Sequence, residues 1–273
     1  MAMQKKFASP LALLVPLLLA LLACAGCPVL QRQDTPVDEI QLINASTKRK
    51  YFLYVPSDYN PQQAYPLMVT LHGSHGFDDS SRQIKEWKAL AEDEKIIVLA
   101  PQLLSPQGVT PAPHPLRMND LRSDDEHILS CMQEVKAKYR IDERAVAISS
   151  FSAGGYPMYF TVMKHPELFT VIIGRSVNWD LSTVGDIPIG DAFRRLKIYI
   201  YFGRTGVSPG ASQWDVVTRD SWRAYRYFYD HGCRGMKIEI IPGSHERKPD
   251  VAWRWWKQII AKQKQAATTQ PKQ

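Results

Sequence analysis

Short apolar runs recur along the chain and alternate with longer amphipathic stretches. In residues 34–55, apolar and polar positions alternate on either side of Asn44-Ala45-Ser46, which predicts an antiparallel β-hairpin. The later runs are continuous over about five residues, as in strands that are buried on both faces. They are residues 67–71, 96–100, 146–149, 169–173, 198–202 and 236–241.

Amphipathic helices are predicted between these strands. The clearest helical patterns cover residues 81–94, 123–139, 220–231 and 249–262. Strands that alternate with helices of this length predict an α/β fold, with a mostly parallel central sheet of about eight strands and helices on both faces. Residues 103–120 contain four prolines and are expected to form a loop over the carboxyl edge of the sheet.

The amino-terminal residues have the pattern of an export signal. Lys5 and Lys6 precede an apolar run over residues 11–23, and Cys24 follows it. The sequence Leu21-Leu22-Ala23-Cys24 resembles the lipobox of bacterial lipoproteins, in which the cysteine carries the lipid. This resemblance implies a protein that is anchored by lipid to a membrane of the bacterial cell envelope, on its periplasmic or extracellular face. A cleaved signal without a lipid is the alternative.

Length and charge fit a single large α/β domain. The expected parts are a signal peptide (1–23), a linker (24–35), an α/β domain (36–262) and a disordered tail (263–273). The net charge of +7 is spread along the 273 residues, and no nucleic-acid-binding module is found. Export would permit a disulfide between Cys131 and Cys233, although two separate buried thiols are an equal alternative.

A serine stands where the third buried parallel strand is expected to turn into a helix. The segment reads Ser150-Phe151-Ser152-Ala153-Gly154-Gly155 and departs from Gly-x-Ser-x-Gly only at Ser150. This pattern predicts a nucleophile elbow, a strained turn that exposes the Ser152 hydroxyl above the sheet. A plain turn or helix cap is the structural alternative.

The best candidate for a base is His245, because a serine hydroxyl is a weak nucleophile until a base takes its proton. It lies in the loop after the last predicted strand and before the last helix. The order serine then histidine agrees with the α/β-hydrolase arrangement.

Backbone amides that could stabilise an oxyanion are expected at two places. One is Ala153, directly after the candidate nucleophile. The other is the loop Leu71-His72-Gly73-Ser74-His75-Gly76, which resembles the oxyanion loops of lipases and esterases and would present the amide of Ser74 or His75.

Motifs dispersed over most of the chain resemble one family. They are Arg49 to Pro56, Tyr65-Pro66-Leu67, Leu71-His72-Gly73, Val98 to Gln102, Asp124-Asp125, Tyr139 to Asp142 and Ser150 to Gly155. Together they resemble secreted α/β-hydrolase esterases related to polyhydroxybutyrate depolymerases and feruloyl esterases. The resemblance implies a serine hydrolase without metal or cofactor, which cleaves small or polymeric esters through an acyl-enzyme. A binding lipoprotein that has lost catalysis and a serine peptidase are the alternatives.

The resemblance also implies a catalytic acid after the strand that ends near Gly203. The expected position holds Gly206, so the acid must come from further along the chain. Asp215 is the first candidate, if a longer loop brings it back to His245. Asp220 is the second, although a helix cap would also explain it.

Overall fold

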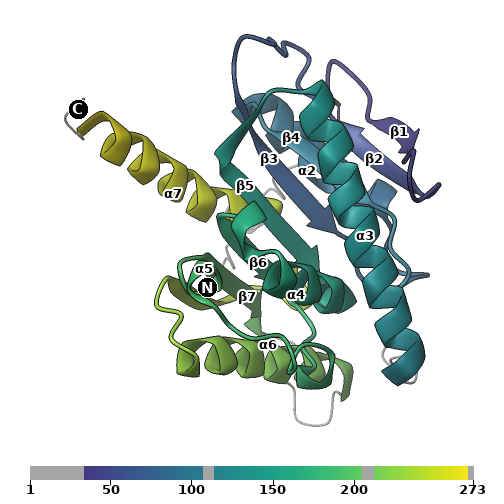
Figure 1. The fold of residues 1–273 in the computed structure, drawn as a ribbon, viewed down its shortest axis with the longest axis vertical. Coiled ribbons are helices and arrows are strands. Elements are labelled where there is room, and N and C mark those ends of the chain that lie inside the picture. The colour runs from purple at the N-terminus through teal and green to yellow at the C-terminus, as the bar shows by residue number, and fades with distance from the viewer. Residues whose placement is uncertain (1–33, 107–113, 205–211, 270–273) are drawn as a thin grey trace, which may run out of the picture. The chain divides into compact units, whose positions relative to one another are not determined.

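The apolar runs form eight strands of one sheet (Figure 1). The order across the sheet is β1-β2-β4-β3-β5-β6-β7-β8. The strands are β1 (Ile40–Ile43), β2 (Lys50–Tyr54), β3 (Tyr65–Leu71), β4 (Ile97–Pro101), β5 (Ile141–Phe151), β6 (Val171–Arg175), β7 (Lys197–Gly203) and β8 (Met236–Ile241).

The computed structural model describes residues 34–106, 114–204 and 212–269. The residues after Arg32 belong to one compact unit. The predicted signal peptide, Cys24 and most of the predicted linker lie outside the described residues.

The sheet is parallel from β3 to β8, and only the strands of the amino-terminal hairpin run against their neighbours. β1 pairs antiparallel with β2, and β2 pairs antiparallel with β4. The remaining neighbours are parallel, so their carboxyl ends lie at one edge of the sheet. The predicted hairpin and the mostly parallel α/β sheet are therefore confirmed.

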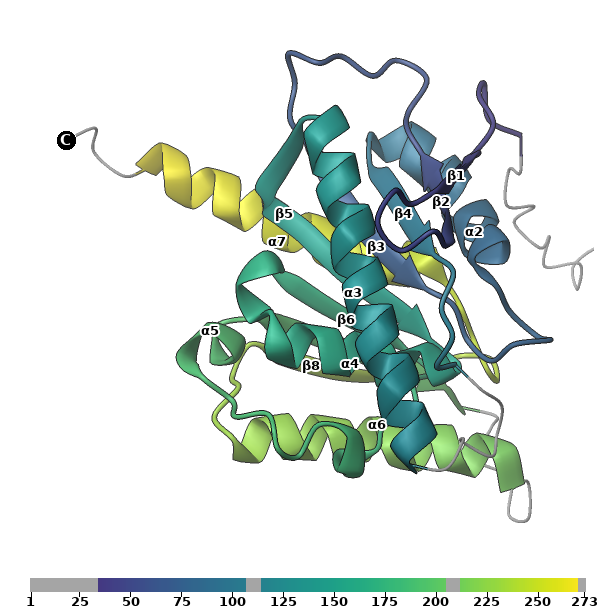
Figure 2. The same cartoon turned by 45° about the vertical axis from the view of Figure 1, so that its right-hand side comes forward.

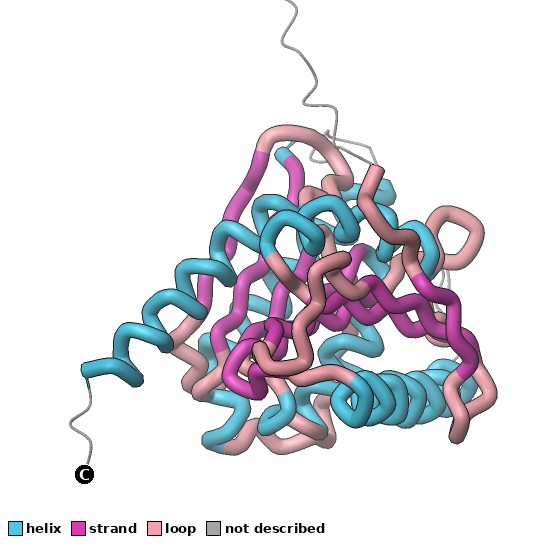
Figure 3. Tube along the Cα trace, turned by 90° about the horizontal axis from the view of Figure 1, so that it is seen from above, coloured by secondary structure: helices cyan, strands magenta, loops and turns pink. Residues whose placement is uncertain are grey.

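Helices cover both faces of the sheet. They are α2 (Ser80–Glu94), α3 (His114–Lys138), α4 (Gly155–Lys164), α5 (Asp191–Arg194), α6 (Ser212–Asp230) and α7 (Pro249–Thr269). Helices α3 and α4 lie together on the face toward the viewer in Figure 1, and Figure 2 brings α2 into view at the right. Figure 3 shows the strands between the helical layers.

Two apolar cores result from this arrangement, because successive side chains of a strand point to opposite faces. Leu67 and Val69 of β3 belong to the core that also contains Phe228 of α6. Met68 belongs to the other core, with Trp87 of α2 and Trp256 of α7. The sheet is thus buried on both sides, as its continuous apolar runs predict.

Three helices are longer than predicted. Helix α3 begins at His114, so the predicted loop is wrong from residue 114 onward; proline is tolerated in a first helical turn, and Pro115 lies there. Helix α6 begins at Ser212, which places Asp215 on a helix instead of a loop. Helix α7 continues to Thr269, into the segment predicted to be disordered.

Cys131 and Cys233 are both buried and both free, so the possible disulfide between them is not formed. Among the described helices, none is both long and apolar enough to cross a membrane.

Candidate active site

The predicted elbow lies at the carboxyl end of β5. The strand ends at Phe151, a 3-10 turn covers Ser152–Gly154, and α4 begins at Gly155. Ser152 has a φ of 51°. This left-handed conformation is costly for a residue with a side chain, and strain of this kind is typical of functional sites. The turn therefore has the backbone geometry of a nucleophile elbow.

Two glycines let neighbouring loops approach the elbow closely. A Cβ on Gly154 would lie 2.4 Å from the backbone oxygen of His72, in the loop after β3. A Cβ on Gly155 would lie 2.3 Å from the backbone oxygen of Asn178, in the loop after β6. The Asn178 amide also donates to the Ser152 oxygen over 3.0 Å. The elbow is thus held between two loops.

Ser150, the departure from Gly-x-Ser-x-Gly, fits this turn. It is fully buried, and its hydroxyl donates to the Met158 sulfur of α4 over 3.1 Å. The small hydroxymethyl group therefore packs under α4 without preventing the turn.

The loop after β3 lies against the elbow. A Cβ on Gly73 would lie 3.2 Å from the Ser152 Cβ. The Gly73 amide donates to Asp78 Oδ2 over 2.6 Å. The His72 ring lies 2.8 Å from the Gly73 oxygen through Nδ1, and its Nε2 accepts from the Leu103 amide over 2.9 Å. Burial lowers the pKa of His72, in keeping with a neutral ring that donates at Nδ1 and accepts at Nε2.

The two candidate amides of this loop differ in their hydrogen bonds. The His75 amide donates to the Pro106 oxygen over 3.0 Å, so it is engaged within the protein. For the Ser74 amide, the described residues provide no acceptor. The Ala153 amide lies in the first turn of the 3-10 helix, where amides lack intrahelical partners. Ser74 and Ala153 are thus the amides better placed to bind an oxyanion.

The loop after β8 brings His245 to the same edge of the sheet. The centre of its ring lies 4.4 Å from that of Phe151, the residue before Ser152. Burial, and next the positive charge of Arg247, lower the pKa of His245 to about 4, against an opposing effect of Asp78. The imidazole is therefore neutral at pH 7 and able to accept a proton.

The two candidate acids lie on α6. Asp215 is in its first turns, and its side chain lies outside the described residues. Asp220 is well inside the helix, so it is not a helix cap. Its Oδ2 accepts from Asn178 Nδ2 over 3.2 Å and from the Trp179 amide over 3.4 Å. Burial raises the pKa of the Asp220 carboxyl. Asp220 thus supports the loop that contacts the elbow.

Residues 44–269 match the family described as "Putative esterase". The chain belongs to this esterase family. A curated relative, the bifunctional acetylxylan esterase/xylanase of Neocallimastix patriciarum, is 27% identical over 113 residues. That match covers 41% of this chain but only 15% of the relative, so the chain spans a small part of that protein's length.

Solved structures show the fold of this esterase-family chain. The ferulic acid esterase of Anaeromyces mucronatus, in complex with ferulic acid, aligns with a TM-score of 0.57 at 17% identity, over 81% of this chain and 90% of that one. The S-formylglutathione hydrolase of Staphylococcus aureus aligns with a TM-score of 0.54 at 15% identity, over 82% and 92%. The fold is that of the α/β-hydrolase esterases.

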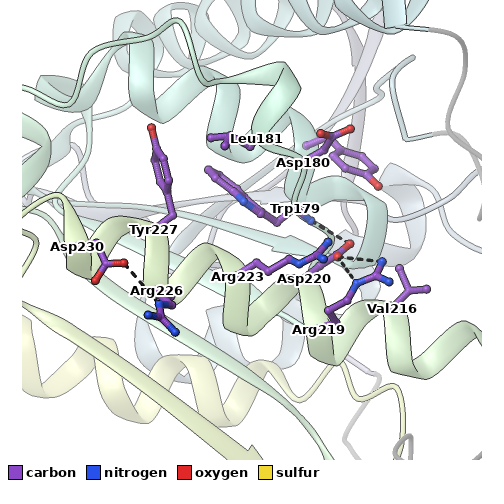
Figure 4. Close-up of a pocket in the computed structure, with 11 residues that line it drawn as sticks. Trp179, Asp180, Leu181, Val216, Arg219, Asp220, Arg223, Arg226, Tyr227 and Asp230 are labelled. Carbon is purple, nitrogen blue, oxygen red and sulfur yellow. Dashed lines mark hydrogen bonds and ion pairs between the residues drawn. The ribbon is translucent and has the colours of Figure 1, made fainter.

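A groove of about 720 Å³ lies between α6 and the loop after β6 (Figure 4). Tyr156, in the first turn of α4, and Trp179 line one side of it, and Asp220 and Arg223 of α6 line the other. Trp179 follows Asn178, whose amide donates to the Ser152 oxygen, but neither Ser152 nor His245 is among the residues that line the groove.

Two arginines near the site carried no signal in the sequence. Arg175, at the end of β6, is fully buried, and its Nη1 lies 2.9 Å from Glu86 Oε2 of α2. Arg247, two residues after His245, donates to Glu86 and to Asp78 Oδ1. The partners are far apart in sequence, so no local pattern reveals the pairing.

Metal-binding groups are not apparent in the described ranges. The His, Cys, Asp and Glu side chains of residues 34–106, 114–204 and 212–269 do not gather in threes that could hold a metal ion.

Proposed function

We propose that this protein is a serine esterase that cleaves carboxylic esters through an acyl-enzyme at Ser152. The observation that carries this proposal is the strained Ser152 at a strand-to-helix turn, with Gly73 against it and His245 packed on the adjacent Phe151. The same edge of the sheet therefore holds a nucleophile, a neutral base and backbone amides.

In the proposed reaction, the Ser152 hydroxyl oxygen attacks the ester carbonyl carbon while His245 accepts its proton. The amides of Ala153 and Ser74 donate to the oxyanion of the tetrahedral intermediate. Collapse of this intermediate breaks the bond to the alcohol, which leaves with the proton from His245. Water then attacks the acyl-enzyme, again with His245 as base, and releases the acid and the free serine.

Asp215 is the proposed acid partner of His245. Helix α6 follows β7, and β7 pairs in parallel with β8, whose end leads to His245. The first turns of α6 therefore start from the same sheet edge as the histidine loop. Asp220 is the second candidate, but its carboxylate already accepts hydrogen bonds from the loop after β6.

Ester substrates and fluorophosphonate labelling test the nucleophile. The wild type should hydrolyse 4-nitrophenyl acetate and react with a fluorophosphonate probe, whereas Ser152→Ala should do neither. Ser46→Ala, which removes an exposed hydroxyl in the β1–β2 turn, is the matched control and should behave as the wild type. Equal labelling of wild type and Ser152→Ala would falsify the assignment, and a labelled protein that leaves esters intact would favour a binding role.

We further propose a lipid anchor at Cys24, from the lipobox-like sequence alone. Expression in a bacterium with an alkynyl palmitate should label the wild type and Cys27→Ala, but not Cys24→Ala. Labelling that survives Cys24→Ala would refute the anchor and leave the esterase proposal untouched.

A further inference from the structure

A partly buried cluster of charges lies beneath the candidate active site. It consists of Asp78, Glu86, Arg175 and Arg247, and we refer to it as the arginine cluster. Glu86 is shared: one of its oxygens binds Arg175 and the other binds Arg247. The Arg175 side chain is completely excluded from solvent, and the Asp78 side chain is 1% exposed.

The cluster joins the two loops that carry the proposed chemistry. Arg247 Nη1 donates to Asp78 Oδ1 over 2.8 Å, and Asp78 Oδ2 accepts from the Gly73 amide over 2.6 Å. One carboxylate thus connects the loop of His245 with the loop of the proposed oxyanion amide. The Arg247 guanidinium also lies 4.3 Å from the centre of the Phe151 ring, on which the His245 ring packs.

The backbone around Arg247 is fixed as well. Its oxygen accepts from Arg175 Nη1 over 3.4 Å and from the Tyr201 hydroxyl over 2.8 Å. The same hydroxyl lies 2.7 Å from the Lys248 oxygen. The backbone of Arg247 is therefore held by β6 and β7, and its side chain is held by the loop after β3 and by α2.

Arg175 in turn connects the cluster to the central strands. Its Nε donates to the Ser149 hydroxyl of β5 over 3.0 Å, and its Nη2 donates to the Thr70 hydroxyl of β3 over 3.1 Å. These two strands lead directly into the elbow and the oxyanion loop. The cluster is consequently fixed to the parts of the sheet that position Ser152 and Gly73.

Stability alone is a weak explanation for such a cluster. Burying charges has a desolvation cost that often equals or exceeds their attraction, and apolar side chains of similar size would be as stable. Apolar contacts are not directional, whereas hydrogen bonds between a guanidinium and a carboxylate fix the angles and distances between loops.

We propose that Arg247 is a positioning residue that, through Asp78 and Phe151, holds His245 and the oxyanion loop in register with Ser152. This inference rests on the proposed esterase function. A displacement of about 1 Å between reacting groups can lower a rate by on the order of 100-fold, so loss of this link should affect turnover more than substrate binding.

The test uses Arg247→Met, which keeps an unbranched side chain without charge, and Arg247→Lys, which keeps a charge and one point of contact. The control is Arg254→Met, because Arg254 is an exposed arginine of α7 that forms an ion pair with Asp250 one turn away. Turnover is measured per site that a fluorophosphonate can label, so that misfolded protein does not contribute.

For Arg247→Met we expect kcat per labelled site to fall by about 10- to 100-fold with little change in KM, by the same displacement argument. Arg247→Lys should retain part of the wild-type kcat, and added guanidinium should restore part of the kcat of Arg247→Met. The acidic limb of the pH profile should move to higher pH, because a positive charge near His245 has been removed. Arg254→Met should match the wild type.

Turnover of Arg247→Met within twofold of the wild type per labelled site, with an unchanged acidic limb, would overturn the inference. If Arg247→Met does not fold, Asp78→Asn decides. It removes a negative charge near His245, so its acidic limb should move to lower pH, and turnover per labelled site within twofold of the wild type would overturn the inference. An active Arg247→Met beside an inactive Ser152→Ala refutes the positioning role alone. A wild type without esterase activity refutes the proposed function and the positioning role together.

Discussion

The two flanks of the elbow are held in different ways. On one flank, the loops after β3 and β8 are joined by charge-assisted hydrogen bonds of 2.6 and 2.8 Å through Asp78. On the other flank, the loop after β6 is tied to α6 by the longer contacts of Asp220, at 3.2 and 3.4 Å, beside an open groove. The first flank carries the groups proposed for chemistry, and the second borders the groove of Figure 4.

This contrast has a physical rationale. Stabilising a transition state requires donors and bases whose positions are set in advance, whereas a groove that accepts esters of different shape can tolerate movement. We therefore expect substitutions near Asp78 to lower stability and activity more than substitutions near Asp220.

The largest difference is expected at the two elbow glycines. In Gly154→Ala the new methyl group would meet the His72 oxygen at 2.4 Å, on the rigid flank. We expect a loss of about 2 to 3 kcal/mol in the free energy of unfolding, as for other overpacked sites, and a loss of fluorophosphonate labelling. In Gly155→Ala the methyl group would meet the Asn178 oxygen at 2.3 Å. Because the contacts of Asp220 to that loop are longer, we expect the loop to yield and the loss to be smaller.

Urea unfolding and labelling rates measure both effects. Gly190→Ala is the control, because no atom lies within 4 Å of its added Cβ and its φ of −85° suits any residue. It should change stability by about 0.5 kcal/mol or less. Equal losses for Gly154→Ala and Gly155→Ala would contradict the difference between the flanks.

The next prediction concerns pH on the rigid flank. Burial and Arg247 disfavour the imidazolium of His245, so the neutral base persists down to its pKa of about 4. The value of kcat/KM should therefore stay level from pH 7 to about pH 5 and fall as the pH drops through about 4, where the base becomes protonated. Circular dichroism at each pH separates this loss from unfolding. A carboxylate partner such as Asp215 would raise the pKa of His245, so an acidic limb near pH 6.5 to 7 would indicate that this pairing outweighs burial and Arg247.

The elbow, the base loop and the positions of the strands along the chain could be predicted from sequence because each is local. A buried strand needs a continuous apolar run, and a tight turn needs small residues, and both requirements are visible within a few positions. Ser152 and His245 thus lie where the sequence places them relative to β5 and β8. Their catalytic roles stay predictions.

The parts that could not be predicted depend on long-range packing. Helix α6 begins at Ser212, well before the segment with the clearest periodic pattern, and this moved Asp215 from an expected loop onto a helix. The arginine cluster joins residues as far apart as Asp78 and Arg247, whose separation of 169 positions hides the pair from any local pattern.

A smaller effect is expected from Asp220→Asn, on the flank of the loop after β6. Asparagine keeps an acceptor for the Trp179 amide but loses the charge that faces Arg219. Because these contacts are long, we expect kcat/KM to fall by only about threefold, close to the value of one weak hydrogen bond. Asp215→Asn, measured in parallel, should lower kcat by on the order of 1,000-fold or more if Asp215 orients His245. The reverse ranking would transfer the acid role to Asp220.

The smallest effect is expected at the groove itself. Leu181 lines the groove and is 48% exposed, so Leu181→Ala should not disturb the core. If acyl chains pack there, losing part of this apolar surface should lower kcat/KM for octanoate relative to acetate by about threefold, near the value of one buried methylene. Ile43→Ala removes a similarly exposed side chain from β1, at the far edge of the sheet, and should leave the octanoate-to-acetate ratio unchanged. A ratio that is unchanged in Leu181→Ala as well would place the acyl chain outside the groove, and the looser flank would then need another explanation than substrate binding.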